Sequence, residues 1–560
     1  MNPGDPRWTA RIDEDEGAQD PLGMNRVTDR LLRDLMPGIT TISPRPRYIA
    51  HHLWALRDTA ESENPSSRVQ LIRGLYQRER IVLLAGKYHA QSDSNKSHTG
   101  LIGSSTAGGI IATDDDVIDL DFSFSSNRSG SYGRNYVGPL QTMGLVDTPE
   151  NADYEEPTDR GDSIATAYGD MADEVNLTQL ATSESISFDT LDTVAEKVCP
   201  CASSNPKAPD RESLRDLYLG RDAPDQFASQ AETRCGTLTL ILHIAQLEGD
   251  AVPLSADMLV DACYYDAVSI DDQVIPASIP TGVDETAARW KALRAHDYFG
   301  YALGVLLSSW LSYLKQTDEA DASLEEFKQG VKSEDTYELM AERIEIETIT
   351  SETPLYEIVT SLWPDTTADS LLDSTSPTPV AMTHPTSEHT LDAVLEEAFS
   401  NNQWQRAHAT WPILLLSLAL RYASPSGPDA IAWAWLGSHT EDDLSPVRFR
   451  EHLKNRLDND ITIGEFIDWI LDEYVIVRAT EIAEGKSDGL SATRGYFMQT
   501  STGWRHVRSH YPGHWGARFD SAVSVLRDLA LLEPNSSTTE LTAAGQKVLD
   551  SKREGQANAN

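Results

Sequence analysis

The residues of this chain whose placement points most directly to chemistry are its arginines. Acidic residues outnumber lysine and arginine 88 to 46, which leaves a formal net charge of −42 at pH 7. Between Leu22 and His89, however, ten arginines and one lysine stand against six acidic residues. Guanidinium groups bind phosphates in a bidentate manner and stack on bases, so Arg45 and Arg47 are candidate contacts for double-stranded DNA or for an acidic protein. The same arginines could pair with the chain's own carboxylates, and the sequence leaves these interpretations open.

Two further segments are basic for a chain of this composition. Residues 503–530 contain four arginines and two acidic residues, with histidines nearby, and residues 122–141 contain two arginines and no acidic residue. A DNA-binding protein needs such donors for phosphates and base edges. The further candidate nucleic-acid contacts are therefore Arg505, Arg508, Arg518 and Arg527 in the later segment, and Arg128 and Arg134 in the earlier one.

Both segments run into the same sequence pattern. The earlier copy is Leu140-x-x-Met143-Gly144-Leu145-Val146, an acidic loop, and Thr158-x-x-Gly161-x-x-Ile164. The later copy is Leu526-x-x-Leu529-Ala530-Leu531-Leu532, a polar loop, and Thr542-x-x-Gly545-x-x-Val548. Each copy predicts the end of a helix, a short apolar strand, a hairpin-like loop and a threonine-capped closing helix.

That order of elements resembles the recognition helix, wing and final helix of winged helix-turn-helix domains. The resemblance implies DNA binding through the helix that precedes the strand, where Arg518 and Arg527 would face phosphates or bases. Winged helices also serve as dimerisation and protein-docking modules, so the pattern leaves a protein partner open as well.

No motif of a known catalytic centre appears in the chain, whether His-Glu-x-x-His, Gly-x-Ser-x-Gly or a Walker sequence. The spacings Arg505-x4-His510 and Arg508-x5-His514 match helical ribonuclease domains, but Pro512-Gly513 would break the helix that such a domain requires. The stretch 100–109 is rich in glycine but lacks the Gly-Lys-Ser/Thr ending of a phosphate loop, so we expect a flexible connection. The run that begins at Asp114 is interpreted as a solvated face. We therefore predict no catalytic residues, and leave open an enzyme whose site is assembled from distant positions.

Four cysteines in 560 residues do not make a disulfide framework. Cys199 and Cys201 form a Cys-Pro-Cys sequence, whereas zinc sites usually space two cysteines by two to four residues. Cys235 and Cys263 lie far downstream. The sequence therefore predicts no metal site and no cofactor, and it leaves open whether these four cysteines bind a metal.

Helical periodicity dominates the chain. Apolar residues recur at helical spacing over 22–35, 49–59, 69–89, 236–248 and 284–316, and after residue 391 over 392–400, 402–423, 428–436, 446–456 and 462–484. We predict a mainly α, multi-domain helical protein with one or two small winged-helix-like (α+β) modules. The expected divisions are a flexible leader (1–20), an N-terminal helical domain with the basic segment and the first module (21–175), an acidic helical domain (176–363), a linker rich in Pro, Ser, Thr and Asp (364–391), a C-terminal helical domain with the second module (392–550) and a tail (551–560).

The composition also indicates a compartment and a solvent. An acidic, lysine-poor chain is typical of a halophile, because carboxylates keep a surface hydrated in concentrated salt. There is no uncharged apolar run of 18 residues, and the first twenty residues are polar. We expect a cytoplasmic protein with no membrane partner.

Two stretches resemble a family of uncharacterised prokaryotic, haloarchaea-like proteins that occur near mobile elements and defence genes. The first is Leu22–Ile39 with Pro44-Arg-Pro-Arg-Tyr48 and Trp54, and the second is Phe466-x-x-Trp469-Ile-Leu-x-x-Tyr474-Val-Ile with Arg527-Asp-Leu529 and Leu541-Thr-x-x-Gly545. They cover about a third of the chain, and the resemblance implies no established activity. Together these observations predict a cytoplasmic, DNA-associated accessory protein linked to mobile elements or genome defence. The alternative is a protein-interaction scaffold whose winged-helix-like modules dock a partner other than DNA.

Overall fold

The structure is a computed structural model that describes most of the chain. The described residues are 20–42, 44–92, 101–112, 117–124, 130–150, 153–201, 205, 207–248, 253–271, 273–317, 321–362, 380–422, 425–440, 443–485, 495–533 and 540–557. The predicted leader except its last residue, much of the predicted linker, Arg128 and the run Asp114–Asp116 lie outside these ranges.

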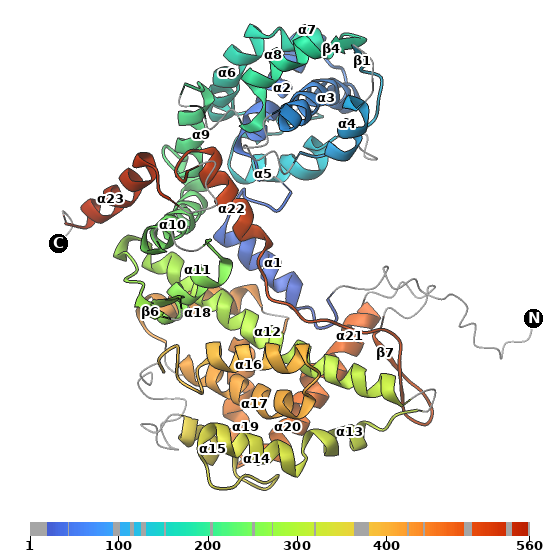
Figure 1. Cartoon of the computed structure of the whole chain (residues 1–560), viewed down its shortest axis with the longest axis vertical. Helices are drawn as coiled ribbons and strands as arrows, with labels where there is room; N and C mark the ends of the chain where they lie inside the picture. Colours follow the sequence, from blue (N-terminus) through green and yellow to red (C-terminus); the bar gives the residue numbers. More distant parts are fainter. Residues whose placement is uncertain are drawn as a thin grey trace, which may run out of the picture. The chain divides into compact units, whose positions relative to one another are not determined.

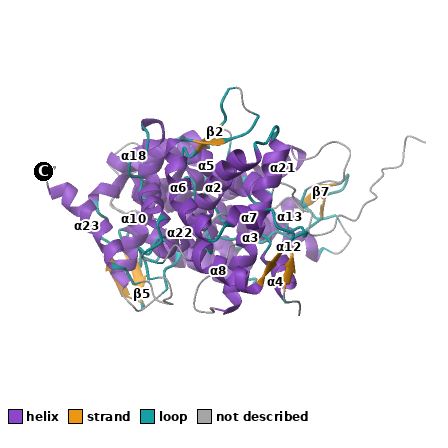
Figure 2. Ribbon diagram, turned by 90° about the horizontal axis from the view of Figure 1, so that it is seen from above, coloured by secondary structure: helices purple, strands orange, loops and turns teal. Residues whose placement is uncertain are grey.

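Helices make up most of the described chain, as predicted, and the strands form only short two-stranded sheets (Figure 2). The chain divides into two compact units, each built from separate stretches of sequence. We call residues 32–262, 268–287 and 516–560 the N-terminal unit, and residues 1–31, 263–267 and 288–515 the central unit. The predicted domains were continuous segments, whereas the last 45 residues belong with the first unit because α22 and α23 pack on its helix α10.

The N-terminal unit contains most of the strands found in the described residues, together with a cluster of helices (Figure 1). Its first elements are α2 (Pro46–Glu63), α3 (Arg68–Ser92), α4 (Ser104–Ile111), β1 (Val117–Asp119), the π-helix η2 (Tyr132–Tyr136), α5 (Val137–Thr142), β2 (Val146–Asp147), β3 (Glu156–Pro157), α6 (Asp159–Glu174), α7 (Leu177–Ala181), β4 (Ser185–Ser187) and α8 (Phe188–Val198). They are followed by α9 (Asp210–Tyr218), α10 (Asp225–Glu248), α11 (Ala256–Tyr265), β5 (Ala267–Ile270), β6 (Gln273–Pro276), η4 (Thr281–Val283), α22 (Ala517–Asp528) and α23 (Ala543–Ala557).

Helix α2 lies at the centre of this unit, where it packs against α3, α6 and α9. Its first three turns are buried on every side, from Pro46 to Leu56. Proline at the first helical position suits a helix start, because its fixed φ matches the helix and its missing N–H needs no partner there. Helix α3 packs in turn on α8. The basic segment of the sequence therefore forms much of a helical core.

The central unit is almost entirely helical. It contains most of α1 (Met24–Leu35) and α12 (Asp284–Gln316), then α13 (Leu324–Val331), α14 (Glu334–Ile344), α15 (Leu355–Leu362), α16 (Glu388–Ser400), α17 (Trp404–Arg421), α18 (Gly427–His439), α19 (Pro446–Leu457), α20 (Ile463–Trp469), the π-helix η6 (Ile470–Val477), α21 (Arg478–Gly485), β7 (Phe497–Gln499) and β8 (Trp504–His506). Helix α12 matches its predicted span, and its apolar stripe, which includes Trp310, is buried as expected.

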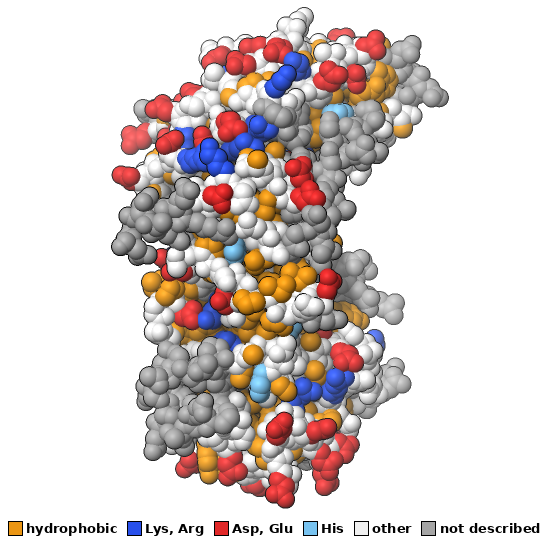
Figure 3. Space-filling model, turned by 60° about the vertical axis from the view of Figure 1, so that its left-hand side comes forward, with side chains coloured by type: hydrophobic (Ala, Val, Ile, Leu, Met, Phe, Trp, Pro, Cys, Tyr) orange, Lys and Arg blue, Asp and Glu red, His pale blue; other side chains and the backbone are white. Residues whose placement is uncertain are grey.

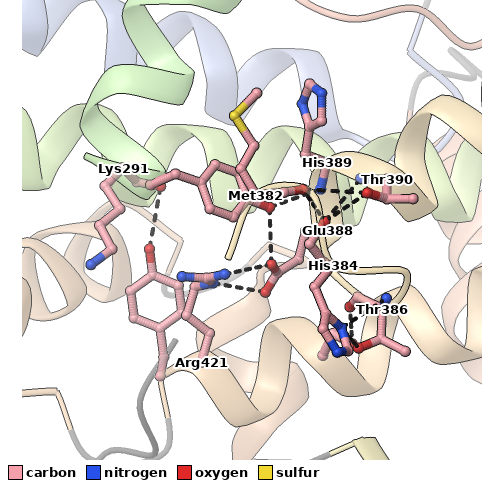
Figure 4. Close-up of polar contacts among 12 residues, drawn as sticks. Lys291, Met382, His384, Thr386, Glu388, His389, Thr390 and Arg421 are labelled. Carbon is pink, nitrogen blue, oxygen red and sulfur yellow. Dashed lines mark hydrogen bonds and ion pairs between the residues drawn. The ribbon is translucent and has the colours of Figure 1, made fainter. Parts of the chain in front are cut away.

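Helices α16 and α17 pack as a pair in this unit, and a buried ion pair joins them (Figure 4). Arg421 donates from Nε and Nη2 to the two carboxylate oxygens of Glu388, at 2.8 and 2.7 Å. The guanidinium carbon lies 4.5 Å from the ring centre of Tyr264, and the hydroxyl of Tyr265 donates to Glu388 over 3.1 Å. Because both carboxylate oxygens of Glu388 accept hydrogen bonds from Arg421, the two charges can be kept away from water.

One local prediction was wrong. The glycine-rich stretch 100–109 was expected to be a flexible connection, but Ser104–Ile111 forms helix α4. Packing on α3, with Ala107 and Ile111 buried, outweighs the low helix propensity of the two glycines in it. Across the described residues, no helix combines the length and apolar character needed to cross a membrane.

Candidate functional site

The earlier copy of the repeated pattern forms the predicted order of elements. Helix α5 ends in a left-handed residue, Gly144, with φ of 68°, and the next amide, of Leu145, donates back into the helix. Strand β2 then pairs with β3 in an antiparallel manner. Thr158 caps the closing helix α6, because its Oγ1 accepts from the amide of Gly161 at 3.3 Å and donates to the carbonyl of Gly144 at 2.9 Å.

The later copy repeats these bonds almost one for one. Ala530 takes the left-handed position with φ of 49°, and a bridge between Leu532 and Leu541 replaces the short sheet. Thr542 accepts from the amide of Gly545 at 3.1 Å and donates to the carbonyl of Ala530 at 2.7 Å. The predicted order of helix end, short strand, loop and threonine-capped helix is therefore found in the earlier copy. In the later copy the helix end and the threonine-capped helix are confirmed, an isolated bridge stands where a strand was predicted, and residues 534–539 of the loop lie outside the described residues. Both copies lie in the N-terminal unit.

Helix α22 occupies the place of a recognition helix in the later copy, but it is largely buried. Asp520 is exposed, Ser524 and Arg527 are half-buried, and the other side chains described from Arg518 to Asp528 are buried. A helix that enters a DNA groove needs a face open to solvent. In this conformation α22 packs inside its unit.

Two arginines hold the C-terminal end of α22. Nε of Arg45 lies 2.8 Å from Oδ2 of Asp528, and the Arg45 side chain is 2% exposed. Arg215 donates to the carbonyls of Leu529 and Ala530, at 2.6 and 3.1 Å. An arginine at a helix C-terminus can donate hydrogen bonds to the free carbonyl groups there. Its positive charge also interacts favourably with the negative end of the helix dipole. Arg45, predicted to contact nucleic acid, thus anchors the later copy to its unit.

Arg47 is buried in the same way. Its Nε and Nη2 donate to the two oxygens of Asp210, each at 2.8 Å, and its Nη1 donates to the carbonyl of Cys199 at 3.1 Å. Burial alone would lower the pKa of Arg47, but Asp210 raises it above its ordinary value. The bidentate geometry expected for a phosphate is therefore used on a carboxylate of the chain itself.

A third arginine of the basic segment is also enclosed. Arg78 donates to Asp58, Glu63 and Ser62 at distances of 2.6 to 2.9 Å, and its side chain has no exposed area. Next to it on α3, Glu79 accepts from the amide and hydroxyl of Ser131. Burial raises the pKa of Glu79 to about 7. Arg78 and Glu79 therefore belong to the helical core, although Asp58 and Glu63 are partly exposed.

The remaining predicted arginines are spread over the two units. Arg134, on η2, is exposed. Arg505 is half-exposed and pairs with Asp321, and the Arg508 guanidinium lies 5.5 Å from the ring centre of Tyr496, in the central unit. On the face shown in Figure 3, basic side chains lie in small groups with acidic side chains between them. The described arginines of the prediction therefore do not form one shared basic surface within either unit.

The loop of the earlier copy is acidic where a DNA-binding wing would be basic. Four carboxylates of residues 147–156 are exposed; they belong to Asp147, Glu150, Asp153 and Glu156. A fifth, Glu155, is buried and accepts from Arg68 at 2.8 Å. Phosphates would be repelled by such a loop, whereas lysine and arginine side chains would be attracted to it.

A small polar pocket lies in the central unit beside α12. It has a volume of about 100 Å³ and is lined by His296, Asp297, Tyr301 and His510, among others. Burial lowers the pKa of both His296 and His510 to about 4, so these rings are neutral. The room suffices for a few water molecules.

His514 closes a network next to this pocket. Its Nδ1 lies 2.9 Å from Asp297, its Nε2 lies 3.2 Å from Asp392 and 3.4 Å from Glu396, and its ring stacks on Tyr301. Burial opposes its charge, but the two aspartates raise the pKa of His514 to about 10. Residues 507–516 form no helix, so the arginine–histidine spacing does not produce a ribonuclease arrangement.

Sequence reasoning missed the acidic side of this network. Glu388, Asp392 and Glu396 follow one another at intervals of four and so share one face of α16. Glu388 meets Arg421, while Asp392 and Glu396 meet His514. The spacing was visible in the sequence, but carboxylates are so frequent in this chain that spacing alone did not distinguish paired carboxylates, two of them buried, from a solvated face.

The Cys-Pro-Cys sequence has a third potential ligand in the structure. Sγ of Cys201 lies 3.3 Å from Sγ of Cys199 and 3.4 Å from Nδ1 of His89, and the three atoms lie within 4.8 Å of one another. His89 comes from the last turn of α3, far away in sequence. No spacing rule could have joined it to the cysteines.

Comparisons with protein-family models, with curated proteins and with solved structures found no match for this chain. The arrangement of the chain's own residues is therefore the basis for a functional proposal.

Proposed function

We propose that this protein is an interaction scaffold, in which the winged-helix-like copies serve packing and protein docking. The observation that carries the proposal is the pairing of three buried arginines, Arg45, Arg47 and Arg78, with carboxylates of the same unit. An arginine that binds a phosphate must leave its carboxylate, and breaking a buried pair costs about 3–5 kcal/mol. Contact with DNA through these side chains would thus come at the expense of the fold.

The earlier copy supplies the surface for a partner. Its loop carries exposed carboxylates at Asp147, Glu150, Asp153 and Glu156, and its closing helix α6 is fixed by the Thr158 cap. A hairpin with this charge favours a protein that presents lysine or arginine. The electrostatic attraction between the loop and such a partner would be strongest at low ionic strength, because salt screens exposed charges.

Charge reversal tests this assignment. The wild-type protein and a double variant, Asp147→Lys with Glu150→Lys, are cross-linked in lysate and the attached proteins are identified by mass spectrometry. A matched control, Glu325→Lys, reverses an exposed charge on α13 of the central unit. We expect a defined basic partner that is retained by the control and lost from the double variant. The same set of proteins on all three baits would contradict docking at this loop.

Association with double-stranded DNA is a second proposal, supported by Arg134. This arginine is exposed on η2 directly before α5, the helix of the earlier copy that corresponds to a recognition helix. The exposed positions Gly138 and Gln141 on α5 add no positive charge. Such a contact would be weaker than that of a typical DNA-binding domain, since few phosphates would be neutralised.

Fluorescence anisotropy with labelled random duplex DNA separates the two proposals. KCl is titrated from about 0.5 M to 3 M, because counterion release makes a phosphate contact weaken with salt. Binding that weakens with salt and is lost in Arg134→Ala would support DNA association. The scaffold proposal predicts no binding in the wild type at any salt, with the fold verified by circular dichroism.

The cellular context is proposed on sequence grounds. The acidic, lysine-poor composition supports a halophilic cytoplasm, and the family resemblance supports a role near mobile elements or genome defence. A halophilic protein should unfold at a higher temperature as KCl rises from about 0.5 M to 3 M, since salt screens the repulsion among its carboxylates. A melting temperature independent of KCl would remove that part of the proposal.

A further inference from the structure

The C-terminal ends of α3 and α8 meet at a cluster of soft ligands. His89 lies in the last turn of α3, Cys199 follows the last residue of α8, and Cys201 comes two residues later. The two helices pack on one another, which holds these ends together. Pro200, between the cysteines, lies near Gly86 of α3, one turn before His89. Its fixed φ limits how far the two cysteines can rotate apart.

We propose that His89, Cys199 and Cys201 form a binding site for a thiophilic metal ion of the Zn²⁺ class. Two thiolates and one imidazole are a ligand set that zinc favours. A tetrahedral zinc ion with Zn–S bonds of about 2.3 Å and Zn–N bonds of about 2.0 Å separates its ligand atoms by roughly 3.5–3.8 Å. Two of the three separations here, 3.3 and 3.4 Å, require movements of only a few tenths of an ångström, and the third, between Cys199 Sγ and His89 Nδ1, is within 4.8 Å.

The burial of the cluster fits a neutral complex. Cys199 and Cys201 are both buried, and His89 is half-buried. Two thiolates balance the charge of a divalent ion, and the buried complex therefore carries no net charge.

Groups around the cluster hold it in place. Arg47 donates to the carbonyl of Cys199 at 3.1 Å while its other nitrogens bind Asp210. The amide of Cys199 donates to Ala195 O, so this residue still belongs to the end of α8. Outer partners of this type orient metal ligands and conserve their geometry when the ion binds.

The described residues supply three ligands, so a tetrahedral ion would keep one position for water. His89 is half-buried, which is compatible with solvent at that position. A disulfide between Cys199 and Cys201 is the competing chemistry, but it requires a sulfur–sulfur distance of about 2.05 Å. The metal site explains why a histidine shares the cluster, whereas a disulfide does not use it.

Metal analysis of the full chain tests the site. The protein is made without a histidine tag, kept reduced with a phosphine, and its metal content is measured by mass spectrometry. We expect about one zinc ion per chain, lost in Cys201→Ser and in His89→Gln. Cys235→Ser, a buried cysteine of α10 outside the cluster, is the matched control and should keep the ion. A wild type without stoichiometric metal, or equal metal in all variants, would overturn the proposal.

A spectroscopic test does not depend on whether the variants fold. Wild-type protein is stripped with a chelator and titrated with Co²⁺. Tetrahedral thiolate ligation should produce a sulfur-to-cobalt charge-transfer band and intense visible bands that Zn²⁺ abolishes. Absence of these bands in the reduced protein, or a mass two hydrogens lighter that shows a Cys199–Cys201 disulfide under reducing conditions, would contradict a metal site.

Discussion

Arg45 and Asp528 form a buried ion pair that joins the residue before α2 to the last residue of α22, across almost the whole length of the sequence. Burial raises the pKa of Asp528 to about 7, although Arg45 lowers it. Burying these two charges therefore carries a large desolvation cost in free energy. The pair also attaches the C-terminal segment to the N-terminal unit.

Removing one member of this pair should destabilise the N-terminal unit. Arg45→Ala leaves the Asp528 carboxylate buried without its partner, so we expect a loss of about 3–5 kcal/mol in the free energy of unfolding at pH 8. The loss should shrink as the pH falls through about 7, because Asp528 becomes protonated and neutral there. Denaturant unfolding with hydrogen exchange of α2 and α22 measures it. Lys197→Ala removes an exposed ion pair with Glu174 and should change stability by less than about 1 kcal/mol. Equal effects of the two substitutions would contradict this account.

The central unit should lose stability in alkali through His514. Its folded pKa of about 10 exceeds the ordinary value of 6.5, so the folded state binds the proton more tightly than the unfolded state. The resulting stabilisation is complete below pH 6.5 and is lost as the pH rises to 10. Thermal unfolding over this range should show a decline in the wild type that is absent in His514→Gln. Parallel curves for the two proteins would exclude His514 as the source.

Glu79 should make the N-terminal unit less stable as the pH rises from about 4.5 to 7. Burial raises its folded pKa to about 7, so the folded state holds a proton that the unfolded state releases in this range. Glu79→Gln resembles the protonated acid and keeps an acceptor for Ser131. We expect the variant to equal the wild type near pH 4.5 and to be more stable at pH 8. His51 acts in the opposite direction, because burial lowers its pKa to about 3 and acid favours the unfolded state. Comparison of variant with wild type at each pH cancels the contribution of His51.

The two copies of the repeated pattern should respond alike to an added methyl group. A Cβ on Gly161 would lie 2.2 Å from the carbonyl oxygen of Leu145, and one on Gly545 would lie 2.1 Å from that of Leu531. Backbone must shift in either case, so Gly161→Ala and Gly545→Ala should each destabilise the N-terminal unit by about 1–3 kcal/mol. Gly109→Ala, in α4 of the same unit, meets no atom within 4 Å and should stabilise by about 0.5–1 kcal/mol. The denaturant midpoint of each variant is compared with that of the wild type. Unchanged midpoints for Gly161→Ala and Gly545→Ala would show that stability does not depend on the close approach of these glycines to the carbonyl oxygens.

Local sequence determined the helices and the repeated pattern. Helix α12 is found over the range predicted by its apolar spacing, and Thr158 and Thr542 cap their helices as predicted. These features depend on contacts within a few turns of the chain, between residues such as Thr158 and Gly161. A period of 3.6 residues and a hydroxyl at a helix start can therefore be recognised from the sequence.

The role of each charged side chain was decided by tertiary structure. Arg45 and Arg134 are both arginines in basic segments, yet one is buried against Asp528 and the other is exposed. The sequence left open whether such arginines face a phosphate or an internal carboxylate, because the alternatives differ in which distant carboxylate the fold brings near. The same reason hid His89 from Cys199: their proximity depends on the packing of α3 against α8, and no local spacing encodes that contact.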